Sequence, residues 1–99
     1  KVQLRVGEVI ACEEVKNSKK LLCSKVKIGS EVRQIVSGIK SQFSPEDMVG
    51  KKVVVVTNLK SAKLAGVESQ GMILCAEDAE GKLSLVTTDA AMPHGAEIR

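Results

Sequence analysis

Two lysines that stand three residues apart, Lys60 and Lys63, lie in a polar segment between two apolar runs. These runs are Val53 to Val56 and Met72 to Ala76. A lysine ammonium is a compact cation, and on a loop placed by rigid strands it suits an anionic partner better than bond-making chemistry. The segment also holds two glycines, which tolerate positive φ and let a second backbone approach closely. The stretch from Asn58 to Cys75 is therefore the candidate functional loop.

The residue patterns of common enzyme sites are absent from the sequence. No G-x-S-x-G, P-loop or H-E-x-x-H motif is present, and no pair of carboxylates stands out on facing strands. Glycine-rich phosphate loops lead into a helix, whereas here a strand is expected to follow the glycines. A pairing of Ser69 with His94 is allowed, but nothing in their spacing requires it. Catalysis is weakly supported, and we expect no cofactor.

The three cysteines, Cys12, Cys23 and Cys75, each stand in an apolar context. None belongs to a C-x-x-C pair, which argues against a zinc site or another metal site. Free cysteine in such surroundings packs as a small hydrophobe. An odd number of cysteines, with no secretory signal pattern at the start, favours a cytoplasmic location.

Composition and charge indicate one small globular domain with a basic part. The chain has 99 residues, of which 43% are hydrophobic and 27% charged, enough for one modest core. Residues 1–66 hold 13 Lys and Arg against 6 Asp and Glu, whereas residues 67–99 hold 2 against 6. Such polarity can present a basic face, although lysines that merely solvate the surface give the same count. No apolar run approaches the roughly 20 residues that a membrane helix needs.

Apolar and polar residues alternate through the first half of the chain, which predicts strands. Val2 to Cys12 is expected to form a long first strand, with a bulge or bend near Gly7, where the alternation is disturbed. Arg5 would then point away from the core. The polar turn at residues 16–20 carries three lysines and is either a solvated hairpin loop or a phosphate contact.

An antiparallel hairpin and a short helix are expected next. Leu22 to Ile28 and Glu31 to Ser37 are strands of equal length joined by two residues. The helix begins at Ser44 as N-cap with proline at the first helical position, acidic residues in the first turn and a hydrophobic staple around the cap. Gly50 ends it early.

The second half completes a recognisable element order. Val53 to Val56 reads as a central strand, Met72 to Ala76 as the next, and Lys82 to Thr87 as a further short strand. Three strands, a short helix and two or more strands match an OB-fold, a five-stranded Greek-key barrel. We therefore expect a single all-β domain over residues 1–99, with a barrel to about residue 87 and a C-terminal extension from about 88 to 99.

The partner expected for this barrel is folded RNA. Aromatic residues make up 1% of the chain, and the only one is Phe43. Proteins that bind unpaired strands stack bases on aromatic side chains, which this chain cannot do. Folded RNA held through phosphates and shape remains the better match for a basic loop.

The candidate loop resembles a known signature. Its residues Asn58-Leu59-Lys60, Lys63, Gly66, Ser69 and Gly71-Met72 are similar to the N-L-K-x-x-K-x-x-G-x-x-S-x-G-M pattern of the tRNA-binding domain family. Further matches lie upstream at Leu4-Arg5-Val6-Gly7, Lys20-Leu21-Leu22 and Val36-Ser37-Gly38-Ile39. One departure is Ser61, where many relatives have a proline that would fix φ in the loop.

This resemblance implies an OB-fold that binds tRNA by its outer corner, without strong sequence preference and without catalysis. The family occurs as the C-terminal domain of bacterial methionyl-tRNA synthetase and as a free-standing tRNA-binding protein, and forms with a C-terminal extension are homodimers. The partners implied are tRNA, a second copy and the catalytic part of the synthetase. An alternative is a protein-interaction or dimerisation module of a synthetase, in which the basic face is incidental.

Carried over by position, the resemblance also implies site residues. Asn58, Lys60 and Lys63 would contact or organise the RNA, with Ser69 and Met72 at the surface beside them. Additional contacts would come from Arg5, Ser37 and Lys40. For Gly66 and Gly71 a conformational role is expected. Met72 has the alternative role of core filler, and Asn58 that of capping its own turn.

Overall fold

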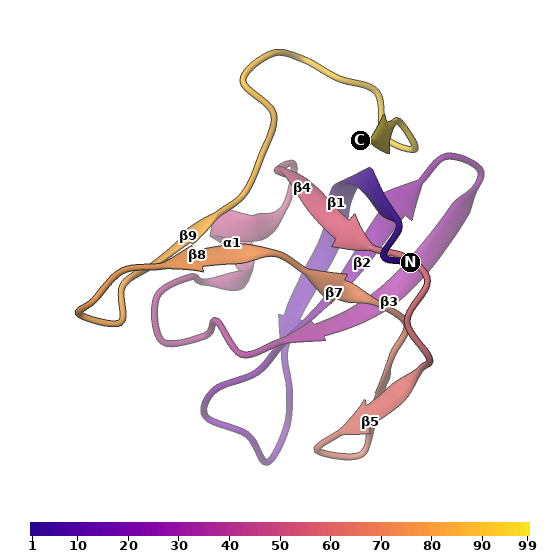
Figure 1. Ribbon diagram of the computed structural model, residues 1–99. Coiled ribbons are helices and arrows are strands. Elements are labelled where there is room, and N and C mark those ends of the chain that lie inside the picture. Colours follow the sequence, from indigo (N-terminus) through magenta and orange to yellow (C-terminus); the bar gives the residue numbers. More distant parts are fainter.

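The computed structural model describes residues 1–99. Its main element is one strongly curled antiparallel sheet with the strand order β3-β2-β1-β4-β7, and β10 adds to the start of β1 (Figure 1). These strands are β1 Leu4–Glu14, β2 Leu22–Ile28, β3 Glu31–Ser37, β4 Lys52–Val56, β7 Met72–Ile73 and β10 Glu97–Ile98. Two small hairpins extend from the sheet, formed by β5 Ala62–Leu64 with β6 Val67–Ser69 and by β8 Cys75–Glu77 with β9 Leu83–Leu85.

The sheet curls until β3 meets the chain that links β6 to β7. The backbone N–H of Gln70 donates to the carbonyl of Gln34 at 2.7 Å, and the N–H of Val36 donates to the Ser69 hydroxyl at 2.9 Å. Together with the helix between β3 and β4, this closure gives the expected five-stranded OB-fold, which is confirmed. The barrel interior is filled by a cluster of ten buried hydrophobic side chains, which include Val9, Leu22, Val26, Ile35, Met48, Val53 and Val55.

The long first strand bends at a different residue from the one predicted. Gly7 stays in register with Val53 of β4, whereas the pairing with β2 shifts between Val9 and Ala11. The bulge therefore lies two to four residues after Gly7, where it was expected. The prediction was misplaced because glycine interrupts the apolar pattern without interrupting the pairing. Its missing side chain has a packing cause instead, since a Cβ there would lie 2.5 Å from a Val26 methyl.

The β2–β3 hairpin and the short helix follow the sequence closely. The hairpin has the predicted bounds and a two-residue turn at 29–30. Helix α1, Pro45–Met48, begins with a complete capping box between Ser44 and Asp47. Met48 belongs to the main core cluster and Phe43 packs against that cluster, as the two ends of the predicted staple require. This helix is four residues long, and no helix of the structure is long and apolar enough to cross a membrane.

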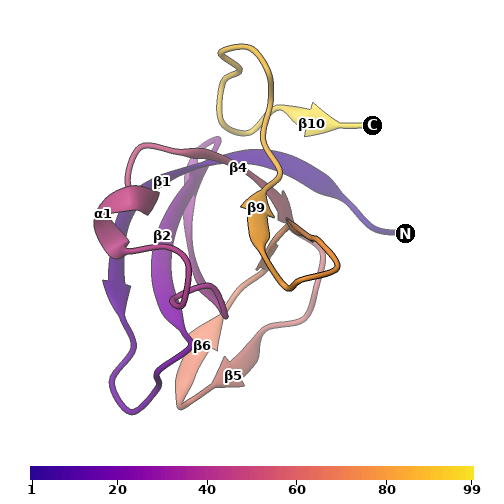
Figure 2. The ribbon, with the colours of Figure 1, turned by 90° about the vertical axis from the view of Figure 1, so that its left-hand side faces the viewer.

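The last strands are shorter than the apolar runs predicted. The run from Met72 to Ala76 is divided at Leu74 into β7 and β8, and β9 covers only the middle of the predicted strand 82–87. The chain end then returns to β1, where the N–H of Gly95 donates to the Val6 carbonyl at 2.7 Å. Seen from the side, the β5–β6 hairpin and the β1–β2 loop lie at one end of the barrel, and β10 lies at the other (Figure 2).

Candidate nucleic-acid interface

The candidate loop is itself a β-hairpin, a feature that the sequence analysis missed. Strands β5 and β6 pair Lys63 with Glu68 and Leu64 with Val67, which leaves a two-residue turn at Ala65 and Gly66. Both turn residues have positive φ, 51° and 81°, as the tight turns favoured in hairpins require. Gly66 was the residue in the sequence that could have indicated this turn, and its expected conformational role is seen in its positive φ. The ladder fixes the position of Lys63, and Lys60 lies two residues before β5, in the segment that leads into the hairpin.

Lys60 and Lys63 are both exposed, and neither takes part in an ion pair. Glu68 stands opposite Lys63 in the ladder but makes no salt bridge with it. These ammonium groups are therefore free to meet an anion from solvent. Met72, directly beyond the hairpin, is 52% exposed, so its alternative role as core filler does not apply.

A second lysine-rich segment lies next to the hairpin tip. The β1–β2 loop carries exposed Lys16, Lys19 and Lys20, and a cleft of about 390 Å³ is lined by Lys16 and Asn17 on one side and by Ala65 and Val67 on the other. Glu13 and Glu14 also line this cleft. In OB-folds the loops between strands 1 and 2 and between strands 4 and 5 flank the nucleic-acid site. The hairpin occupies the second of these loops.

Lys40 belongs to the same end of the barrel. Its backbone N–H donates to the Lys20 carbonyl at 3.1 Å, and its ammonium pairs with the Glu14 carboxylate at 3.2 Å. That partner makes Lys40 less available to RNA than the hairpin lysines. Arg5 lies elsewhere, in a polar cleft of about 400 Å³ near the chain end, where its guanidinium donates to the Gly95 carbonyl at 3.0 Å.

Ser69 does not lie at the surface where the resemblance places it, and this expectation is corrected. The residue is 5% exposed, and its hydroxyl accepts from the Val36 N–H at 2.9 Å and donates to the Gly71 carbonyl at 3.1 Å. A small hydroxyl at this position satisfies backbone groups where β3 meets β6. Ser69 is therefore a closing residue of the barrel, and its hydroxyl is occupied by two backbone partners.

Ser37 is half-buried, and its hydroxyl oxygen is buried without a hydrogen-bond partner. Its contact with RNA stays a prediction. Asn58 has a different structural role from the capping alternative: its side-chain amide donates to the Lys1 carbonyl and accepts from the Gln3 N–H at 2.9 Å. It therefore fixes the start of the segment 58–69, which contains the β5–β6 hairpin, to the chain that precedes β1.

Gly71 has a steric requirement as well as an unusual backbone. Its φ is 155°, and a Cβ there would lie 2.9 Å from the Val56 carbonyl oxygen. That oxygen belongs to β4, the strand with which β7 pairs. The glycine thus lets the second leg of the hairpin segment rejoin the sheet.

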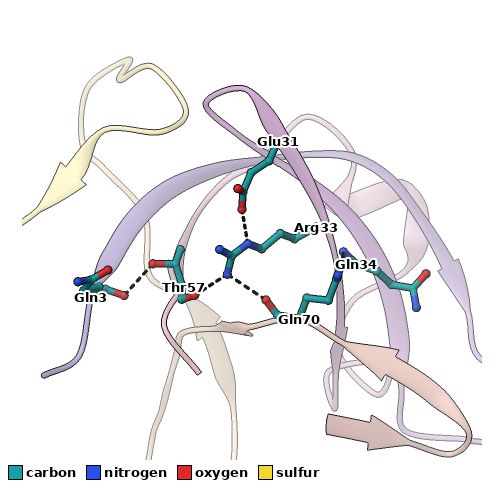
Figure 3. Close-up of polar contacts among 6 residues, drawn as sticks. All are labelled: Gln3, Glu31, Arg33, Gln34, Thr57 and Gln70. Atoms are coloured by element: carbon teal, nitrogen blue, oxygen red, sulfur yellow. Dashed lines mark hydrogen bonds and ion pairs between the residues drawn. The ribbon is translucent and has the colours of Figure 1, made fainter. Parts of the chain in front are cut away.

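Arg33 is a residue that the sequence analysis did not single out. Figure 3 shows its guanidinium between Glu31, Thr57 and Gln70. It pairs with the Glu31 carboxylate and donates to the carbonyls of Thr57 and Gln70. No sequence pattern reveals such contacts, because the carbonyl partners lie 24 and 37 residues away along the chain.

The cysteines have no catalytic surroundings. Cys12, Cys23 and Cys75 are free thiols, and burial raises the pKa of each above the ordinary cysteine value. Such thiols are poor nucleophiles at neutral pH, because the reactive species is the thiolate. His94 is not available as a base for them, since its Nδ1 accepts a hydrogen bond from the Gly29 N–H at 3.0 Å. The structure also contains no cluster of three His, Cys, Asp or Glu side chains that could hold a metal ion.

Comparison with known proteins places this geometry in a family. The family model described as "Putative tRNA binding domain" matches residues 4–97. The chain is 58% identical over 99 residues to a methionine–tRNA ligase of Methanocaldococcus jannaschii, covering 100% of this chain and 15% of that protein. It is also similar to the structure of a MetRS related protein from Pyrococcus horikoshii, with 44% identity, a TM-score of 0.94, and coverage of 99% of this chain and 90% of that one.

A more distant structure with the same fold is the chaperone CsaA of Bacillus anthracis, with 25% identity and a TM-score of 0.89. That match covers 99% of this chain and 90% of the chaperone. The chain thus spans about one seventh of the ligase relative and nearly all of these two smaller proteins. Because the family model covers nearly its whole length, this protein belongs to the family of tRNA-binding domains, which bind without catalysing a reaction.

Proposed function

We propose that this domain is a tRNA-capture module whose contact surface is centred on the β5–β6 hairpin. The observation that carries the proposal is the pair of exposed, unpaired lysines, Lys60 and Lys63, next to the lysine-rich β1–β2 loop. Lys40 and Met72 border this surface, and Arg5 lies farther away as a secondary contact. Asn58 takes part by positioning the hairpin segment.

The partner that fits this surface is RNA with a fixed three-dimensional shape. Phe43, the only aromatic residue, packs against the core and lines a different cleft beside β9, so the hairpin surface offers no ring on which an unpaired base could stack. Ammonium groups on a stiff hairpin recognise phosphates at a fixed spacing, which a folded RNA supplies. Binding through phosphates is largely independent of base sequence, so the module would hold many tRNAs.

In the working protein the module would act by raising the local concentration of tRNA near a synthetase active site. The similarity to one seventh of a methionine–tRNA ligase supports an appended domain, most simply at the C-terminus, and the similarity to smaller proteins supports a free-standing homologue. In either form the catalytic part of methionyl-tRNA synthetase is its partner. The cytoplasm is the compartment where this work would take place.

A homodimer belongs to the same proposal. Exposed apolar side chains are present near both chain ends, at Val2, Val86 and Met92, and a second copy would cover such surface. Two copies would present two lysine hairpins to one RNA and strengthen binding by avidity. Sedimentation at several protein concentrations should give twice the monomer mass. A monomer at all concentrations that still binds tRNA would remove the dimer from the proposal.

The test of the surface is the double variant Lys60→Ala, Lys63→Ala. Its affinity for total tRNA should fall, and the slope of log K against log salt should become shallower by about 0.7–0.9 for each lost phosphate contact. The matched control is Lys51→Ala, Lys82→Ala, which removes the same charge from exposed lysines that line a different cleft, beside β9. An equal loss in both variants would mean that only net charge matters, and an unchanged hairpin variant would leave the interaction-module alternative.

A further inference from the structure

Arg33 occupies an unusual place in this barrel. It comes from the middle of β3, and its side chain is 25% exposed. One guanidinium nitrogen, Nη1, donates to the Thr57 carbonyl at 2.5 Å and to the Gln70 carbonyl at 3.2 Å, while Nε pairs with the Glu31 carboxylate. One side chain thus joins strand β3 to Thr57 and to Gln70, as Figure 3 shows.

The two carbonyl acceptors stand at the two roots of the lysine hairpin. Thr57 comes directly before the segment that begins with Asn58, and Gln70 comes directly after β6. The intervening residues, 58–69, contain both Lys60 and Lys63. Arg33 therefore bonds the segment where it leaves the barrel and again where it returns.

Backbone ladders join the two legs on either side of the roots, β4 with β7 at Val56 and Met72, and β5 with β6 at Ala62 and Ser69. Between these ladders, other contacts hold each root separately. On the first root, the Thr57 N–H donates to the Gln3 carbonyl at 2.9 Å. On the second root, the Gln34 N–H donates to the Gln70 side chain at 2.9 Å. Arg33 reaches both roots, and hydrogen bonds from a charged donor are roughly twice as strong as neutral ones. It is therefore suited to fix the direction in which the hairpin points away from the ladder of β4 and β7.

We propose that Arg33 is the positioning residue of the tRNA-binding hairpin. It acts on affinity by holding Lys60 and Lys63 in register with the β1–β2 loop, and so lowers the conformational cost of binding. The inference rests on the proposed function, because it assumes that these two lysines meet the RNA. It assigns to Arg33 a role in recognition that does not require the guanidinium to touch the RNA.

The chemistry of the guanidinium explains why arginine is needed here. Its donors diverge in one plane, so the group can face a carboxylate and two carbonyls at once. Lysine carries the same charge as a single compact ammonium on a flexible stem and cannot span both roots in the same way. The substitution Arg33→Lys therefore keeps the charge of the surface and removes the clamp.

A double-mutant cycle tests the proposal. Affinity for total tRNA at two salt concentrations is measured for the wild type, Arg33→Lys, the Lys60→Ala, Lys63→Ala pair, and the triple variant. We expect Arg33→Lys alone to weaken binding about tenfold, the scale of lost preorganisation, and to flatten the salt slope. In the background without the lysines it should change affinity less than about twofold, because residues that act through one another are not additive. Arg99→Lys, at an exposed C-terminal residue, is the matched control.

Hydrogen exchange supplies a second readout that a general loss of stability would not give. In Arg33→Lys the amides of residues 59–68 should exchange faster, while those of Val9 and Val26 in the core should keep their protection. This measurement works on any variant that folds, and Arg33→Gln serves in the same cycle if Arg33→Lys unfolds below the assay temperature.

Each outcome decides between distinct accounts. Wild-type affinity in Arg33→Lys overturns the inference, and so does a loss that is additive with the lysine pair, because additivity means that Arg33 acts on the RNA independently of the lysines. Wild-type affinity in the lysine pair overturns the proposed surface as well. Uniform loss of protection throughout Arg33→Lys would show a structural role only and would also overturn the inference.

Discussion

Replacing Ser69 by alanine should destabilise the barrel at the point where β3 meets β6. The substitution removes two hydrogen bonds, one accepted from the Val36 N–H and one donated to the Gly71 carbonyl. Val36 is buried, so its N–H cannot turn to water and is left without an acceptor. Leaving one buried donor unpaired costs about 1–3 kcal/mol, whereas the Gly71 carbonyl is partly exposed and regains a water partner.

The cost should appear as a lower melting temperature. A domain of this size loses about 4–8 °C for each kcal/mol, so Ser69→Ala should melt on the order of 10 °C below the wild type. Circular dichroism melts measure this shift, with Ser84→Ala as control, because Ser84 is an exposed serine on β9. An unchanged melting temperature combined with weaker tRNA binding would refute the reasoning, since it would place the Ser69 hydroxyl on the RNA and not in the barrel seam.

Three further predictions concern other parts of the fold. Gly71→Ala should lower stability by about 1–3 kcal/mol in denaturant titrations, because the new methyl would press on the Val56 carbonyl oxygen at 2.9 Å. The Ser44 N–H holds the pKa of the Asp47 carboxyl below its usual value. Asp47 therefore stabilises the fold fully above the unfolded-state pKa of about 3.9 and loses this effect as pH falls through the lower folded-state pKa. Wild type and Asp47→Ala should accordingly converge in urea stability in acid, and equal differences at all pH values would contradict this. The raised cysteine pKa values predict slow reaction with a disulfide reagent at neutral pH, and a fast thiol would contradict their burial.

Local rules predicted much of the barrel because they rest on neighbouring residues. The β2–β3 hairpin and the N-cap at Ser44 depend on turn residues and on spacings of a few positions, and both were predicted at the positions where the structure has them. The β5–β6 hairpin was missed because its strands are three residues long, too short to show an alternating pattern. The bulge was misplaced because Gly7 breaks the pattern of side chains while keeping its partner in β4.

In the candidate site, too, some features could be predicted from the sequence and others could not. The exposed lysines were predicted from residue type and from a resemblance, and both lie in solvent. Residue type does not say which way a small hydroxyl points, so Ser69 was expected outside and is buried. The sequence pattern of a strand suggests that an arginine in it is a solvated surface charge. The role of Arg33 can be recognised only in the folded chain, where two carbonyls distant in sequence lie beside it.

The central claim is that the lysine hairpin and the β1–β2 loop together meet folded tRNA. The most direct measurement is a titration of the isotope-labelled domain with tRNA, followed by the backbone amide signals of every residue. We predict that the largest changes fall on residues 59–66 and 16–20, with little change in the β8–β9 hairpin at residues 75–85. Changes centred on β8–β9, or spread evenly over the whole surface, would contradict the account.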